Sequence, residues 1–171
     1  LDATGATGSG AELSAKITDW TNADGVRVDG VLTVAGTGPV TISNDANDYQ
    51  GQTNVLAGST LIVTGNLGET SLLNNAGTVQ IGSGSDTANV QVGGLSGSGS
   101  LAIRGTSKIT VSTADDLTVD NTLSFDSSGT FAVSGTGADR IDLNFTQADA
   151  SGAGTFYLTK VNFNFSGNNK Q

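Results

Sequence analysis

The sequence lacks cysteine, histidine and methionine, and it has one proline among 171 residues. Without cysteine, disulfides and thiolate chemistry are excluded, so stability must come from packing and backbone hydrogen bonds. Without histidine, a Ser-His-Asp triad, a histidine metal site and imidazole base catalysis are excluded. Paired carboxylates are the remaining possibility for catalysis in this chain.

Charge is also scarce. Charged residues make up 13% of the chain, and 7 Lys+Arg stand against 16 Asp+Glu, giving a net charge of -9. This balance argues against a nucleic-acid or anionic-membrane surface, because both need basic clusters. No apolar run approaches the length of a membrane-spanning helix. The start at "LDATGATGSG" has no initiator Met and no signal-peptide pattern, which predicts a segment of a longer protein.

What the chain does have is a long series of short apolar clusters. Each alternates apolar with polar residues and is rich in β-branched residues, which is the period of a strand and not of a helix. The predicted strands cover 31–34, 40–42, 53–56, 60–63, 71–73, 78–81, 89–92, 101–103, 108–111, 117–119, 123–125, 131–133 and 141–145.

The turns between these clusters favour one all-β architecture. Their glycines and asparagines suit either a sandwich of hairpins or the faces of a parallel β-helix. Hairpins prefer Asn-Gly or Asp-Gly loops, and the two such pairs, Asp24-Gly25 and Asp29-Gly30, both precede the regular region. Segments 32–42 and 131–143 share a strand, Gly-x-Gly, strand pattern, as a repeat would. We therefore predict a parallel β-helix, or solenoid, over 11–124.

The two ends of the chain differ from the middle. Residues 1–10 are predicted to be a flexible leader. Residues 11–20 fit either two helical turns or a strand, and we favour the strand. Aromatic residues gather late in the chain, and we predict that they form a capping sheet or hairpin over 125–171 that protects the last strand edges. The predicted cap core consists of Phe125, Phe131, Phe145, Phe156, Tyr157, Phe163 and Phe165.

The stretch "NDYQGQTNVLAG" at 47–58 is predicted to turn one corner of a coil. Corners stack on equivalent corners, where polar side chains can form hydrogen-bonded ladders. We expect Tyr49 to lay its ring over the stack edge with its hydroxyl in water, and Gly51 to adopt a backbone conformation closed to other residues. Thr53 and Val55 then resume the strand, which Gly58 ends.

This spacing resembles the passenger-associated transport repeat of bacterial autotransporters. The resemblance covers 31–65 and rests on Gly36, Gly38, Asn47, Tyr49, Gly51, Thr53, Val55, Gly58 and Leu61. The sequence departs from the family pattern at Val34, Asp48 and Gln50. Segments 93–103, 135–143 and 150–158 are similar to the C-terminal autochaperone region of such passengers.

The resemblance implies a right-handed parallel β-helix that is exported through an outer-membrane barrel and displayed on, or released from, a Gram-negative cell. It implies a non-catalytic stalk and autochaperone in an adhesin or virulence passenger of type V secretion. Its partners would be the translocator barrel and upstream passenger coils, with host surfaces or self-association as further contacts. The resemblance implies no cofactor and no nucleic acid.

The candidate catalytic and metal residues favour structural roles. The carboxylate pairs are Asp45 with Asp48, Asp115 with Asp116, and Asp139 with Asp142. The first pair suits a turn, and the other two point apart or lie in a solvated corner. A calcium loop starting at Asp45 would need an acid where Leu56 stands. The glycines of 96–100 are followed by no Lys-Ser/Thr, so a turn is preferred to a phosphate loop.

Two alternatives stay open from the sequence. One is the C-terminal part of a polysaccharide-degrading β-helix acting through a carboxylate pair. The other is a β-sandwich glycan-binding module, which would show antiparallel hairpins from residue 31 onward.

Overall fold

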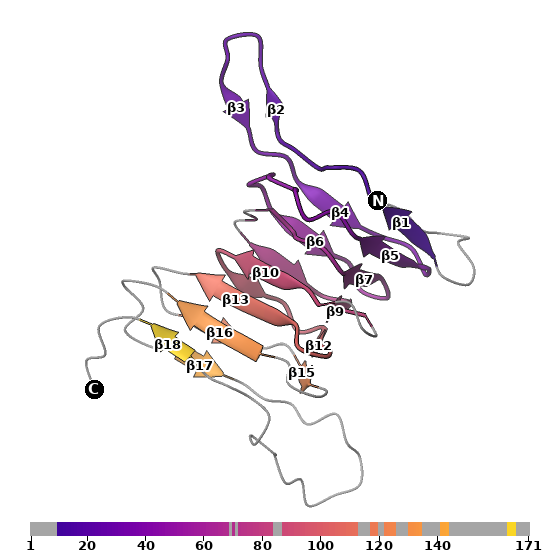
Figure 1. Ribbon diagram of the computed structural model, residues 1–171, viewed down its shortest axis with the longest axis vertical. Helices are drawn as coiled ribbons and strands as arrows, with labels where there is room; N and C mark the ends of the chain where they lie inside the picture. The colour runs from indigo at the N-terminus through magenta and orange to yellow at the C-terminus, as the bar shows by residue number, and fades with distance from the viewer. Residues whose placement is uncertain are drawn as a thin grey trace, which may run out of the picture.

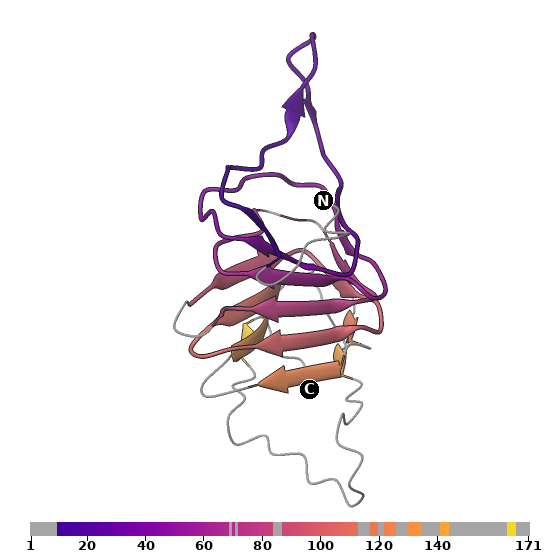
Figure 2. The same cartoon turned by 90° about the vertical axis from the view of Figure 1, so that its right-hand side faces the viewer.

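A computed structural model describes residues 10–68, 70, 72–83 and 87–112, together with the strands 117–119, 122–125, 130–134, 141–143 and 164–166. It is an all-β parallel solenoid of about four turns. Figures 1 and 2 show the strands stacked in layers along one axis, with the β2–β3 hairpin projecting from one end.

The strands stack into separate sheets, each running along the solenoid. The six-stranded sheet has the order β1 (Ala11–Leu13), β5 (Pro39–Ile42), β7 (Thr60–Val63), β9 (Thr78–Ile81), β12 (Ser100–Ile103) and β15 (Thr122–Phe125). One four-stranded sheet contains β4 (Leu32–Val34), β6 (Thr53–Val55), β8 (Leu73–Asn75) and β11 (Leu95–Ser96). The other contains β10 (Asn89–Val92), β13 (Lys108–Ser112), β16 (Thr130–Ser134) and β18 (Asn164–Ser166). A fourth, two-stranded sheet pairs β14 (Leu117–Val119) with β17 (Ile141–Leu143).

All pairings in these four sheets are parallel and in register. Contacts between successive turns give the length of one turn: Thr87 meets Thr106 19 residues on, and Ser96 meets Asn74 22 residues back. Parallel neighbours need such crossovers, because a hairpin can join only antiparallel strands. The β-sandwich alternative, which needed antiparallel hairpins from residue 31, is therefore wrong.

The core is a set of aliphatic ladders that run through the turns. Every second residue of a strand points inward, so the register stacks Val40 on Leu61, Leu61 on Val79 and Val79 on Leu101. None of these four is more than 1% exposed. Burying one such side chain contributes about 1.5 to 3 kcal/mol. Because each side chain is covered by those of the turns on either side, this stabilisation requires the neighbouring turns to be folded.

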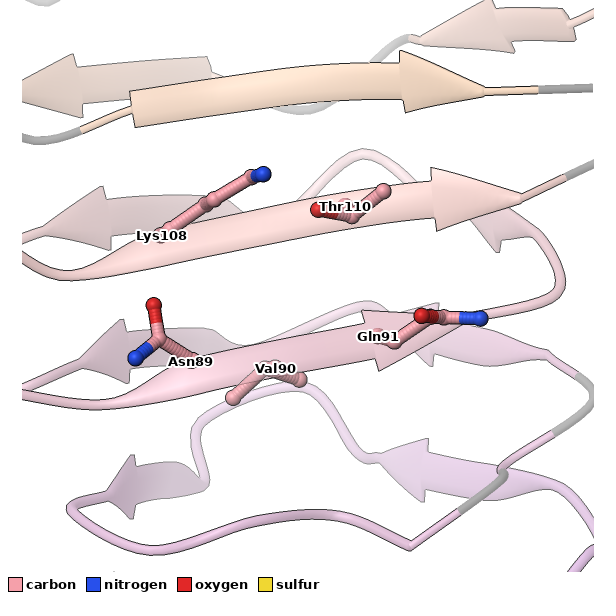
Figure 3. A pocket seen from close by; sticks show the side chains of 5 residues that line it. All are labelled: Asn89, Val90, Gln91, Lys108 and Thr110. Atoms are coloured by element: carbon pink, nitrogen blue, oxygen red, sulfur yellow. The ribbon is translucent and has the colours of Figure 1, made fainter.

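The outward positions of the same strands are polar and uncharged for most of the stack. On β10 and β13 the outward side chains include Asn89, Gln91 and Thr110 (Figure 3). On β6, β8 and β11, Asn74 bridges Asn54 and Ser96 at 3.3 Å each. Uncharged amide and hydroxyl side chains, in place of ion pairs, therefore make this surface polar.

Between residues 31 and 134 the strands predicted from alternation agree with the structure to within one residue at each end, with two differences. The strand expected at 71–73 is Leu73–Asn75, where Leu73 and Asn75 point inward. The pair Leu95–Ser96 was missed because two residues are too short to show a period. At the N-terminus, Ala11–Leu13 is a strand pairing with β5, so the helical alternative for 11–20 is wrong.

One antiparallel element departs from the stack. β2 (Trp20–Thr21) pairs with β3 (Arg27–Val28), and the turn between them is closed by Asn22, whose Oδ1 accepts hydrogen bonds from the N–H of Asp24 and Val26. Gly25 has a φ of 77° in this turn. The turn of this hairpin contains Asp24-Gly25, one of the two Asp-Gly pairs that precede the regular strands.

Parallel pairing continues past residue 124, where the cap was predicted to begin. Phe125 pairs with Ile103, Phe131 pairs with Ile109 and is fully buried, and Phe165 pairs through β18 with Val133. The described strands of this region thus extend the solenoid. The other predicted cap residues, Phe145, Phe156, Tyr157 and Phe163, lie outside the described residues, as do residues 1–9 of the predicted leader 1–10, and the cap stays a prediction.

Candidate functional site

The repeat residues meet at a corner organised around Tyr49, which is 2% exposed. Its hydroxyl lies 2.7 Å from Thr53 Oγ1, and Thr53 Oγ1 lies 2.9 Å from Thr70 Oγ1. The Thr70 hydroxyl donates to the Gly51 carbonyl at 2.6 Å. Because each hydroxyl has one proton, Thr53 must donate to Thr70 and Tyr49 to Thr53.

The expectation that the Tyr49 hydroxyl would be in water is therefore wrong. The ring fills the interior of the coil, and the hydroxyl is satisfied by the threonine chain. Burial raises the pKa of Tyr49 above its ordinary value, while the hydrogen bonds to Thr53 and Thr70 oppose that rise. Sequence reasoning missed Thr70, although the recurrence of Gly-x-Thr at Gly51-Gln52-Thr53 and Gly68-Glu69-Thr70 would have indicated it.

Asn47 links three successive turns and is 5% exposed. Its Oδ1 accepts a 2.7 Å hydrogen bond from the Ile17 N–H, 30 residues earlier. Its Nδ2 donates to the carbonyl of Asn44 at 2.9 Å and to that of Asn66 at 2.7 Å. These are the cross-turn hydrogen bonds expected of a corner.

The repeat glycines act in different ways. Gly36 and Gly58 have φ values of 95° and 79°, in the left-handed region that favours glycine. Gly38 is buried without such a φ. Gly51 has no positive φ either, so its predicted role is corrected: a β-carbon there would lie 1.6 Å from the Gly30 carbonyl oxygen. Glycine is needed at 51 for close approach of two turns.

The two aliphatic residues of the repeat, Val55 and Leu61, lie in the core.

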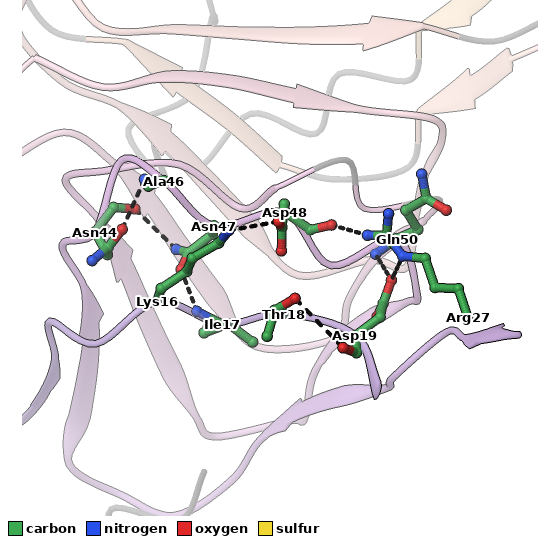
Figure 4. Close-up of polar contacts among 10 residues, drawn as sticks. All are labelled: Lys16, Ile17, Thr18, Asp19, Arg27, Asn44, Ala46, Asn47, Asp48 and Gln50. Carbon is green, nitrogen blue, oxygen red and sulfur yellow. Dashed lines mark hydrogen bonds and ion pairs between the residues drawn. The ribbon is translucent and has the colours of Figure 1, made fainter. Parts of the chain in front are cut away.

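A second polar cluster, which sequence reasoning did not identify, fixes the base of the β2–β3 hairpin (Figure 4). Asp19 accepts hydrogen bonds from Arg27 Nε at 2.7 Å, from the Gly30 N–H at 2.8 Å and from the Gln50 N–H at 2.8 Å. The Asp19 side chain is 1% exposed. These donors lie 8, 11 and 31 residues away, and no local pattern predicts that they converge.

Two charged side chains continue this cluster. Lys16 Nζ lies 2.6 Å from Asp48 Oδ2, and the Arg27 guanidinium donates to the Asp48 carbonyl. The hydrogen bond from Lys16 is the main cause that lowers the pKa of Asp48, and Asp48 is well exposed. Such a pair contributes little to stability.

We predict acid-induced loosening of this hairpin. Burial tends to raise the pKa of Asp19, but the hydrogen bonds from Gly30, Gln50 and Arg27 outweigh it and hold the pKa below its ordinary value of 3.8. A depressed folded-state pKa means that the stabilisation is present above the unfolded pKa and is lost as pH falls through the folded one. The urea concentration at the unfolding midpoint should therefore decrease as the pH is lowered from about 5 to about 2.

In the Asp19→Asn variant the part of this pH dependence due to Asp19 should disappear, because the amide does not titrate. Glu12→Gln, which leaves the hairpin base intact, is the matched control. An Asp19→Asn profile with the wild-type slope would contradict the assignment.

The hairpin presents apolar side chains to solvent. Trp20 is 66% exposed, and Val26, Val28 and Val31 are between 43% and 64% exposed. These are the largest exposed apolar side chains in the described part of the chain, apart from Leu56.

The carboxylate pairs come out as follows. Asp45 is exposed in a turn, and Asp48 is engaged with Lys16. Asp142 lies in β17, and Asp115, Asp116 and Asp139 lie outside the described residues. Within the described part, no three His, Cys, Asp or Glu residues gather as metal ligands. Residues 96–100 join β11 to β12 through Gly97, whose φ is 89°, so a turn occupies the place of the phosphate loop.

Among the described residues, no helix is long and apolar enough to span a bilayer. No family model, no curated protein and no solved structure matches this chain.

Proposed function

We propose that this chain is a non-catalytic passenger segment of a secreted or surface-displayed autotransporter of the adhesin or virulence type. In this proposal it is a right-handed β-helical stalk, closed by a C-terminal cap, that promotes passenger folding and passage across the outer membrane of a Gram-negative bacterium. Its partners are its own translocator barrel and the upstream passenger coils, with host surfaces or other copies as further contacts.

The observation that carries the proposal is the corner built by the repeat residues. Asn47 bridges three turns, Tyr49 and Thr53 form a buried hydroxyl chain, and Gly51 permits close approach of Gly30. These residues thus have physical reasons for their spacing in a stacked coil. The support for the proposed role thus comes from the spacing of these residues and from their geometry in the corner.

A stacked coil of this kind suits folding that starts at one end. In a solenoid each turn contacts only its neighbours, so folding can nucleate at one stable turn and propagate. A chain that leaves a narrow pore unfolded would benefit from such a nucleus in the segment nearest the membrane. The absence of cysteine also removes disulfide-trapped folded forms before export.

The test is a secretion assay with this chain between a reporter passenger and an outer-membrane barrel. We expect deletion of 31–171 to lower the amount of protease-resistant reporter at the cell surface several-fold, while barrel insertion is unchanged. A control that replaces the chain with an unrelated folded segment of equal length should not restore display. Unchanged display and protease resistance after deletion would overturn the proposal.

The same purified chain discriminates the hydrolase alternative. Release of new reducing ends from any polysaccharide, lost in Asp45→Asn with Asp48→Asn, would favour a carboxylate-based enzyme. The stalk proposal predicts no release from any substrate tested.

A further inference from the structure

The described strands β4 to β13 are nearly free of charge. In strands β4 to β13, all of which are described, Lys108 is the single charged residue. The remaining outward positions hold Thr, Ser, Asn, Gln and a few small or aliphatic residues. The Lys108 ammonium group is therefore surrounded on these strands by uncharged, mainly hydroxyl and amide, side chains.

Lys108 lies in a shallow depression on the outer face of β10 and β13. The depression is lined by Asn89, Val90, Gln91, Lys108 and Thr110. The register pairs Asn89 with Lys108 and Gln91 with Thr110, so their four side chains mark the corners of a rectangle (Figure 3). Its sides follow from sheet geometry, about 4.8 Å between strands and about 6.6 Å along a strand. Val90 is buried and forms the floor.

The charge on Lys108 is not neutralised by a neighbour in the described part of the chain. Lys16 is paired with Asp48, and Arg27 with Asp19, whereas no described carboxylate lies within ion-pair distance of Lys108. The chain as a whole has a net charge of -9, so this ammonium group is a local positive charge on an acidic protein. It attracts an anion that the rest of the surface repels.

The surrounding groups select the class of anion. Asn89 and Gln91 each offer amide donors and a carbonyl acceptor, and Thr110 offers a hydroxyl, which together match the hydroxyl groups of a sugar. Among the five lining residues Lys108 is the single cation, and one monovalent cation suits a carboxylate better than a phosphate dianion. The open face of β10 and β13 admits an extended chain.

We propose that the β10–β13 face binds a carboxylated saccharide. Lys108 contacts the carboxylate of a uronic acid residue, and Asn89, Gln91 and Thr110 hydrogen-bond its hydroxyls. This site lies beyond the stalk and autochaperone role, and its ligand class is an acidic polysaccharide.

The test uses the full chain with galacturonate oligomers and neutral galactose oligomers of equal length, titrated at low salt and followed by amide chemical shifts. We expect the acidic oligomers to bind more tightly, and salt to weaken that binding. Lys108→Gln should lower the affinity up to about fivefold, as an exposed charge pair allows. Gln91→Ala should lower it without a change of charge, and Lys16→Gln, on a different face, should not.

Three results would overturn the proposal. Neutral oligomers that bind as tightly as acidic ones would remove the role of the cation. Unchanged affinity in Lys108→Gln, with a wild-type urea midpoint, would place the binding elsewhere. Free acetate or monomeric galacturonate that binds as tightly as the oligomer would indicate a bare carboxylate site with no saccharide recognition.

Discussion

Replacing Tyr49 with alanine is expected to lower the free energy of unfolding by about 3 to 5 kcal/mol, the range for removing a large buried aromatic side chain. Tyr49 is the largest fully buried side chain in the described core, and the residue above it in the stack, Gly68, cannot fill the space. Urea denaturation followed by far-UV circular dichroism measures the change.

Tyr49→Phe is the matched control, because it keeps the ring and removes only the hydroxyl. Thr53 then loses one donor but still donates to Thr70, so we expect a cost of about 0.5 to 1.5 kcal/mol. If the two variants lose equal stability, the hydroxyl and not the ring organises the corner. If Tyr49→Ala loses less than the phenylalanine variant, the buried position of Tyr49 is contradicted.

Gly97→Ala is expected to cost about 2 to 5 kcal/mol, from a left-handed conformation and from a steric clash. The φ of Gly97 is 89°, and a β-carbon would lie 2.2 Å from the Asn75 carbonyl oxygen of the preceding turn. That carbonyl already accepts the 2.8 Å hydrogen bond from the Gly99 N–H. The alanine must therefore push two turns apart in the middle of the stack.

Gly58→Ala separates the two causes. Gly58 has a φ of 79°, but nothing lies within 4 Å of a β-carbon there. It should show the conformational cost alone, about 1 to 2 kcal/mol. Thermal and urea unfolding of both variants measure the difference, and equal losses would mean that turn-to-turn contact at Gly97 contributes nothing.

The strands of this protein could be located from sequence because their signal is local. Alternation of apolar and polar residues is set by neighbours within one strand, and clusters such as 60–63 and 78–81 coincide with the strands found there. The choice of parallel coils over hairpins also followed from local evidence, since the Asp-Gly pairs precede residue 31 and one of them closes the β2–β3 turn.

The functional details behaved differently. The spacing of the repeat singled out Tyr49 and Gly51, yet it placed the Tyr49 hydroxyl in water and gave Gly51 an unusual backbone conformation. Both errors involve contacts between turns: the hydroxyl chain from Tyr49 through Thr53 continues to Thr70 of the next turn, and Gly51 lies against Gly30 of the preceding one. The sequence of a single turn does not show which atoms of the neighbouring turn will contact it.

By itself, then, the sequence determined the strand period, the glycine-rich corners, the all-β class, and the exclusion of cysteine and histidine chemistry. Tertiary structure alone decided that Asp19 collects donors from three separate segments, that Tyr49 is enclosed, and that Lys108 has no described carboxylate beside it. The reason is that strand period depends on side chains two residues apart, whereas burial and charge pairing depend on the stacking register, which joins residues a full turn apart.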